Sequence, residues 1–280
     1  MMIIRGRGFD FSRNTYVMGI LNVTPDSFSD GGLHNTTEAA VEHALKMIKE
    51  GAAIIDIGGE STRPGHVKIS TQEELSRVIP VIEALRKVSD IPVSIDTTKP
   101  EVAEAALAAG ADIVNTVEGV DAPCRMLDIV KETGAPFIMT YEKSYVNHFG
   151  EALIAMAETA VEAGINPDRI VVDPGIGFGK TQEDNLRILN ELPIITQIGY
   201  PVLLGCSRKS VIGNVIRSEA HSNSDPGEPG EDMQSERLPG TIVTTVLAAL
   251  AGVGIVRVHD VADNIRAIDM LSAICTVNTD

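Results

Sequence analysis

The chain has 280 residues, of which 44% are hydrophobic, and its formal net charge at pH 7 is −16. This length allows one large core, and α/β barrels of this size routinely form a single domain. We expect no nucleic-acid partner, because phosphate recognition needs a basic surface. We also expect no membrane partner, because no run of 18 apolar residues occurs.

The three cysteines, Cys124, Cys206 and Cys275, are far apart and odd in number. They match no metal-ligand spacing and are typical of a reducing compartment. The apolar part of the N-terminus is too short for a signal peptide. We therefore expect a cytoplasmic protein. If its substrate is an anion, basic residues must be concentrated at the site.

The first 14 residues contain Arg5-Gly6-Arg7-Gly8 and predict a short hairpin that closes the bottom of a barrel. Eight apolar runs follow, and each predicts a buried strand: 17–21, 53–57, 92–95, 112–114, 136–139, 170–172, 201–204 and 254–258.

Helical periodicity occupies the segments between these runs. Residues 41–48 show it and end at Gly51, residues 75–85 follow a capping box of Ser70 and Glu73, and 241–251 form a late apolar helix. A second capping box, Thr98 with Glu101, is predicted before another helix, with Pro100 in its first turn.

Strands alternating with helices eight times predict a (β/α)8 TIM barrel, which makes residues 1–280 one domain. An open doubly wound sheet is the alternative, although it more often has five to seven strands. Residues 217–237 fall outside the alternation. They are acidic and rich in Pro and Gly, so we expect a mobile loop there.

Polar side chains follow every strand, at the end where such barrels place their active sites. Acids follow the second, third and sixth strands, whereas cations follow the seventh and eighth. In chain order the strand ends carry Asn22, Asp56, Asp96, Asn115, Thr140, Asp173, Lys209, and the pair Arg257 and His259. This sorting predicts a substrate with two different ends.

Asp96, Asn115 and Asp173 are rich in acceptors and suit a flat ring with several N–H donors, such as an aminopyrimidinone. The alternative for Asp96 is a helix cap, and for Asp173 it is turn initiation before Pro-Gly. Neither alternative explains why an apolar strand leads directly into each acid.

The other end of the substrate is predicted to be anionic, because Arg63, Lys209, Arg257 and His259 are basic. Asn22 can present a carbonyl oxygen to Mg²⁺, which keeps most of its waters and binds through phosphates. Lys209 as a Schiff-base lysine is disfavoured, because it lies past a strand end where a cation usually stays protonated.

The glycine-rich segment 175–179 lacks the ending of a phosphate-binding P-loop. It is interpreted as backbone that lets a flat substrate approach closely, with Phe178 available to pack against an aromatic ring.

Six segments resemble, in the same order, motifs of the dihydropteroate synthase family: 19–32, 56–65, 94–101, 173–180, 207–210 and 257–261. The resemblance implies a TIM barrel that is usually a homodimer and that depends on Mg²⁺. It also implies a transferase of folate biosynthesis that joins p-aminobenzoate to a pterin hydroxymethyl diphosphate, releases diphosphate and is inhibited by sulfonamides.

Residue roles follow from the same resemblance. Asn22 resembles the Mg²⁺ contact, and Asp96, Lys209, Arg257 and His259 resemble the catalytic groups. The residues that resemble the family's diphosphate contacts are Thr62, Arg63, Arg257 and His259. Those that resemble its pterin pocket are Asp96, Asn115, Met139, Asp173 and Lys209. Phe178 and Ser210 resemble the aminobenzoate end, and loops at 24–33 and 60–67 are implied to close over the site.

The chain departs from the family pattern at two strand ends. Met139 is followed by Thr140-Tyr141-Glu142 instead of His-Met, and Asn115 by Thr116-Val117 instead of Asp-Ile. These changes leave open a paralogue that uses another aryl amine. A pterin-binding methyltransferase would not need Arg257 and His259 for a diphosphate, and a non-enzymatic pterin-binding protein would tolerate loss of Asn22 or Arg63.

Overall fold

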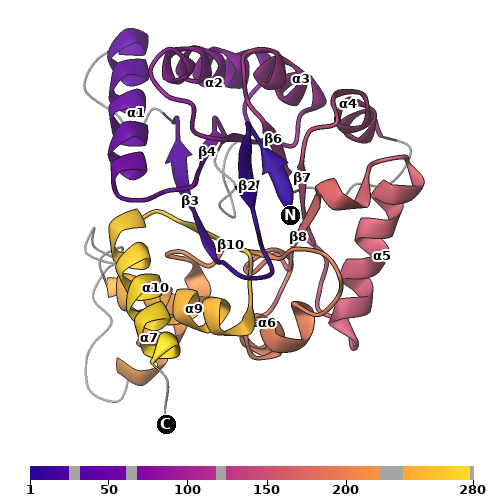
Figure 1. Ribbon diagram of the computed structural model, residues 1–280, viewed down its shortest axis with the longest axis vertical. Helices are drawn as coiled ribbons and strands as arrows, with labels where there is room; N and C mark the ends of the chain where they lie inside the picture. The colour runs from indigo at the N-terminus through magenta and orange to yellow at the C-terminus, as the bar shows by residue number, and fades with distance from the viewer. Residues whose placement is uncertain (25–31, 61–67, 118–123, 221–235, 278–280) are drawn as a thin grey trace.

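The computed structural model describes residues 1–24, 32–60, 68–117, 124–220 and 236–277. Helices surround a central ring of strands, and a small antiparallel hairpin crosses the middle of the view (Figure 1). The hairpin strands are β1 (Met2–Ile4) and β2 (Arg7–Phe9). The ring contains β3 (Tyr16–Asn22), β4 (Ile54–Gly58), β5 (Val93–Asp96), β6 (Ile113–Thr116), β7 (Phe137–Thr140), β8 (Ile170–Asp173), β9 (Leu203–Leu204) and β10 (Ile255–Val258).

The eight ring strands are parallel, in the order β8-β7-β6-β5-β4-β3-β10-β9. A single parallel bridge between Val172 and Val202 joins the two ends of this sheet. The sheet therefore closes on itself, which confirms the predicted (β/α)8 TIM barrel and rules out the open sheet.

Helices follow the strands as the alternation predicts. They are α1 (Gly32–Lys49), α2 (Thr71–Arg86), α3 (Pro100–Ala108), α4 (Arg125–Thr133), α5 (Phe149–Glu162), α6 (Gln182–Ile195), α7 (Ser210–Ala220), α9 (Leu238–Ala251) and α10 (Val261–Thr276), with a 3-10 turn at Pro167–Arg169. Within the described part of the chain, no helix combines the length and apolarity needed to cross a membrane.

Two local predictions are wrong. The N-cap of α3 is Lys99, whose side chain makes no capping bond, so Thr98 and Glu101 form no capping box. Instead Thr97 Oγ1 accepts from the backbone N–H of Lys99 at 3.1 Å. The predicted loop 217–237 also starts too early, because α7 continues through Ala220. Its residues 221–235 lie outside the described part of the chain, and Arg237, at its predicted end, is the N-cap of α9.

Alternation along each strand separates two cores. Side chains that face the helices form the larger core, which includes Ile57 and Val172. Side chains that face the barrel interior form a second core at the bottom, which includes Ile54 and Ile255. Polar groups such as Asp56 and Arg257 lie two residues after Ile54 and Ile255. They also face the barrel interior, because successive side chains on a strand alternate sides.

The hairpin closes the bottom of this interior core, as predicted. Met2, Ile4 and Phe9 are buried against Met18 and the bottom residues of the other strands. Arg5 (φ 47°) and Gly6 (φ 73°) take left-handed conformations in the tight turn that joins β1 to β2.

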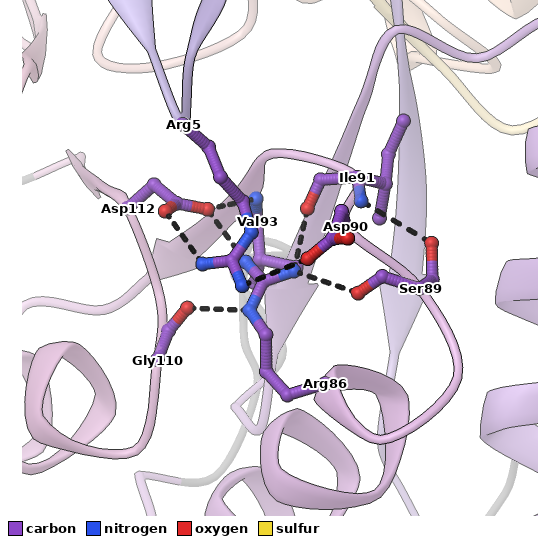
Figure 2. A network of polar contacts seen from close by, with 8 residues as sticks. All are labelled: Arg5, Arg86, Ser89, Asp90, Ile91, Val93, Gly110 and Asp112. Carbon is purple, nitrogen blue, oxygen red and sulfur yellow. Dashed lines mark hydrogen bonds and ion pairs between the residues drawn. The ribbon is translucent and has the colours of Figure 1, made fainter.

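A polar network ties the hairpin turn to the barrel strands (Figure 2). Arg86, at the end of α2, donates from Nη2 to Asp112 Oδ2 at 2.5 Å and from Nε to the Gly110 carbonyl at 2.6 Å. Asp112 Oδ2 also accepts from the Val93 backbone at 2.9 Å, and Oδ1 pairs with Arg5. The Asp112 carboxylate thus links the end of α2, the starts of β5 and β6, and the β1–β2 hairpin.

We expect Asp112→Ala to lower the free energy of unfolding by about 3 kcal/mol, because it leaves a nearly buried Arg86 charge without its carboxylate. Urea denaturation measures the change. Asp90→Ala is the control, because Asp90 is 86% exposed and pairs with the same Arg5, so its removal should cost less than about 0.5 kcal/mol. Equal effects of the two substitutions would contradict a structural role for the Asp112 network.

Candidate functional site

The centre of the barrel mouth is a buried cation between two acids. Arg257, on β10, donates from Nε to Asp56 Oδ2 at 2.5 Å and from Nη2 to Asp96 Oδ2 at 2.5 Å. Asp56 is fully buried, and Asp96 is 7% exposed. The sequence predicted that acids and cations would face opposite ends of a substrate. In this structure Arg257 itself pairs with two of the acids, because the inward side chains of β10, β4 and β5 meet in the barrel interior.

Burial and the neighbouring charges shift the pKa values of Asp96 and Arg257. Burial raises the pKa of Asp96 to about 7, although Arg257 opposes the shift, and the nearby Asp56 and Glu74 carboxylates add to it. Burial disfavours the charge on Arg257, but Asp56 and Asp96 outweigh that effect and raise the pKa of the guanidinium.

Acceptor groups remain available beside this pair. Asn115, at the end of β6, donates from Nδ2 to Asp56 Oδ2 at 3.2 Å. Asp96 Oδ1 is buried and accepts no hydrogen bond from the described residues. A buried acceptor without a donor is costly, so this oxygen is suited to a ligand N–H group.

Asp173 and Lys209 form the opposite wall. Asp173 Oδ1 accepts from the Gly175 backbone at 2.8 Å, and burial raises the pKa of its carboxyl group, with Lys209 opposing. Lys209 donates from Nζ to the Ile176 carbonyl, and Nζ lies 4.3 Å from the centre of the Phe178 ring. Burial lowers the pKa of Lys209, although Asp173 opposes the shift. Its place past a strand end therefore does not leave this lysine in solvent.

Lys209 is presented by a turn with unfavourable backbone geometry. The Lys209 N–H donates to the Cys206 carbonyl at 3.2 Å, and Arg208, inside this turn, has φ 56°. The Arg208 side chain forms a double hydrogen bond to Asp260, with Nε 2.9 Å from Oδ2, and its carbonyl accepts from Arg237. These contacts hold a conformation that an L-residue rarely adopts.

The same turn contacts His259. Ser207 Oγ lies 3.0 Å from His259 Nδ1 and accepts from the His259 backbone N–H at 3.2 Å. Ser210 is exposed at the first position of α7. Asn22 ends β3 beside Gly58 of β4 and is partly exposed.

The glycines of 175–179 have a different role from the predicted one. A Cβ at Gly175 would lie 2.2 Å from the Tyr141 carbonyl oxygen, and one at Gly179 would lie 2.2 Å from that of Glu142. Both glycines also have positive φ. At these two positions the chain's own backbone, rather than a substrate, makes the close approach that requires glycine.

Other predicted residues lie elsewhere. Met139 is fully buried in the helix-facing core, and the interior face of β7 carries Ile138 and Thr140 instead. Thr62 and Arg63 lie outside the described residues, as do most of the loops 24–33 and 60–67.

Sequence reasoning assigned no role to Asp56, Ser207 or Asp260, which hold Arg257, His259 and Arg208. An acid inside a strand as apolar as β4 was the available signal for Asp56.

The sequence matches a family of known proteins over most of its length. Residues 18–259 match the pterin binding enzyme family, and the chain belongs to it. It is 43% identical over 280 residues to the dihydropteroate synthase of Clostridium beijerinckii, covering 98% of this chain and 99% of that one. A curated Bacillus subtilis relative of the same name is 45% identical over 269 residues, covering 94% and 90% of the two chains.

Solved structures agree with these relatives. A Clostridium difficile dihydropteroate synthase determined with pteroic acid has a TM-score of 0.85 and 45% identity, covering 95% of this chain and 99% of that one. The family assignment therefore rests on sequence and on three-dimensional structure.

We expect Arg208→Gly to be more stable than Arg208→Ala by about 1 kcal/mol, because both lose the Asp260 pair but only Ala keeps the left-handed strain. Urea denaturation of the two variants measures the difference. Arg187, exposed within α6, is the control position, where Ala should be the more stable by about 1 kcal/mol. The same order at both positions would contradict a strained turn.

Proposed function

We propose that this chain is a dihydropteroate synthase, a transferase of folate biosynthesis. It condenses 6-hydroxymethyl-7,8-dihydropterin diphosphate with p-aminobenzoate to give 7,8-dihydropteroate and diphosphate. The observation that carries the proposal is the buried Asp96 Oδ1, which has no hydrogen-bond partner among the described residues and lies beside Asn115 and Arg257, in a chain that matches this family over residues 18–259.

The pterin ring lies in the acceptor-rich part of the mouth. Asp96 accepts ring N–H groups, with Asn115 next to it and Asp173 on the other wall. A carboxylate suits an aminopyrimidinone edge, because two parallel N–H donors match its two oxygens. Burial raises the pKa of both acids, to about 7 for Asp96, and Arg257 at Asp96 and Lys209 at Asp173 oppose that shift.

The reaction exchanges one bond for another at the pterin methylene carbon. The p-aminobenzoate nitrogen forms a bond to this carbon as the carbon–oxygen bond to diphosphate breaks, and the amine loses a proton. Diphosphate leaves with the electron pair, so negative charge grows on it. Arg257, His259 and Arg63 stabilise that charge, and fixed cations act most strongly where charge develops.

Magnesium is the proposed cofactor, with Asn22 as its protein ligand. No cluster of three or more His, Cys, Asp or Glu side chains in the described ranges is suited to hold a metal. An ion bound by one carbonyl oxygen, waters and substrate phosphates needs no such cluster, which fits Mg²⁺. When bound, it supplies positive charge to the leaving diphosphate.

We also propose a cytoplasmic homodimer. The three cysteines are free thiols, which fits a reducing compartment. Val243 and Leu250 on α9 and Met270 on α10 are more than half exposed, and α9 and α10 lie side by side (Figure 1). Exposed apolar side chains gathered on neighbouring helices favour a protein partner, and sedimentation equilibrium measures the mass.

We expect Asp96→Asn to weaken pterin diphosphate binding by about 10-fold to 100-fold, because ring donors lose a carboxylate acceptor. Wild-type affinity should also fall as pH drops below about 7, where Asp96 takes up a proton, whereas the Asn variant should lose that dependence. Titration calorimetry from pH 5.5 to 8 measures both. Unchanged affinity in Asp96→Asn, with Asp90→Asn as control, would place the pterin elsewhere.

We expect EDTA to abolish diphosphate release and added Mg²⁺ to restore it. Asn22→Ala should raise the Mg²⁺ concentration that gives half the maximal rate, because the ion loses its protein ligand. Asn147→Ala, an exposed asparagine before α5, is the control. A full rate in EDTA would overturn the magnesium proposal while leaving the transfer reaction standing.

A further inference from the structure

Lys180 follows the glycine-rich segment, and the proposed reaction gives it no role. It is partly buried between the segment that follows β7 and the segment that follows β8. Its Nζ donates to the Tyr141 carbonyl at 2.7 Å and to the Phe178 carbonyl at 2.9 Å. The same atom lies 5.3 Å from the centre of the Tyr141 ring. One ammonium group therefore joins two segments that lie almost 40 residues apart in the chain.

Two further hydrogen bonds connect these segments, one from a backbone N–H and one from a serine hydroxyl. Tyr141 N–H donates to the Asp173 carbonyl at 2.9 Å, and Ser144 Oγ donates to the Gly179 carbonyl at 3.1 Å. Gly175 and Gly179 allow this approach, as described above. The Lys180 side chain reaches carbonyls on both segments, so its charge balances carbonyl oxygens brought close together.

The contact fixes Phe178 from two sides. Lys180 holds its carbonyl oxygen, and Lys209 Nζ lies 4.3 Å from its ring centre. Gly177 N–H, one residue before it, donates to Asn185 Oδ1 at 2.7 Å. Lys180 thus ties the Phe178 backbone to the Tyr141 segment through two hydrogen bonds to protein carbonyls.

Tyr141 is one of the residues at which this chain departs from the family pattern. Its ring packs edge-on against Phe149, with centroids 5.2 Å apart, and it lies beneath the Lys180 ammonium. Substitution at 141 therefore alters the surface on which Lys180 rests, and through Lys180 it can alter the place of Phe178.

We propose that Lys180 is a positioning residue for the aryl amine acceptor, holding Phe178 and the Tyr141 segment at the separation that the acceptor ring requires. This inference rests on the proposed function, which assigns Phe178 to the p-aminobenzoate end. Among the described residues Lys180 donates to two protein carbonyls, and not to Asp96, Asn115 or Arg257, to which the proposed function assigns the donor substrate. It therefore affects binding of the acceptor and leaves binding of the donor substrate unchanged.

The ionisation of Lys180 gives a second readout. Burial lowers the pKa of Lys180 to about 8, and Lys209 adds to that effect, whereas Asp173, Asp184 and Glu142 oppose it. Above this pH the amine is neutral and holds the two carbonyls less strongly. An arginine at the same position keeps its charge at every pH of the assay.

The experiment first measures diphosphate release by the wild-type protein with pterin diphosphate and p-aminobenzoate. No release would overturn the proposed function itself. With release established, we expect Lys180→Met to raise KM for p-aminobenzoate about ten-fold or more while KM for pterin diphosphate changes less than about two-fold. Lys143→Met, an exposed lysine in the same segment, is the control and should change neither constant.

A pH series with Lys180→Arg completes the test and does not depend on the Met variant folding. Wild-type KM for p-aminobenzoate should rise above about pH 8, and in Lys180→Arg this rise should be absent. An unchanged acceptor KM in Lys180→Met, an equal rise in both KM values, or the same alkaline rise in wild type and Lys180→Arg would overturn the role assigned to Lys180.

Discussion

The pairing of Arg257 with Asp56 and Asp96 makes a charged barrel interior possible. Each of these groups would be costly to bury alone, because a lone charge loses its hydration without compensation. Together they place one guanidinium and two carboxylates on the barrel axis, and Asn115 adds a neutral donor to Asp56. Asp96 Oδ1 accepts no hydrogen bond within the described part of the chain, so the pairing that stabilises the cluster also leaves this oxygen able to bind a ligand.

Two parts of the mouth are held in different ways. Around Arg208 an ion pair with Asp260 maintains a turn that the backbone alone disfavours, and this turn presents Ser207 and Lys209. Around Phe178 glycines remove the Cβ atoms that would clash, and Lys180 supplies the charge that holds the facing carbonyls. In both parts a basic side chain that is close in sequence to a proposed substrate contact hydrogen-bonds to protein groups instead.

The departures from the family pattern fall on positions with clear structural roles. Thr140 is buried on the interior face of β7, while Tyr141 packs on Phe149 and contacts Lys180. Thr116 is buried at the end of β6, one residue past Asn115, so the acceptor groups on the strand itself are unchanged. The acids proposed to bind the pterin are thus retained, and the altered Tyr141 adjoins Lys180, which donates to the Phe178 carbonyl.

The sequence determined the barrel because the strand and helix periods are local properties. Eight apolar runs, the bottom hairpin and the polar strand ends at Asp96, Asn115 and Asp173 could be located from spacing alone. The capping box at Thr98 failed because cap geometry depends on backbone angles that Lys99, one residue later, adopts.

Only the tertiary structure decided which side chains meet. Arg257 and Asp56 are 201 residues apart and touch because β10 and β4 both pair with β3, so their inward side chains point into the same narrow interior. The requirement for glycine at 175 and 179 comes from the carbonyls of Tyr141 and Glu142, which lie more than 30 residues earlier in the chain. Such contacts are set by strand order and barrel closure, and no local pattern in the sequence carries them.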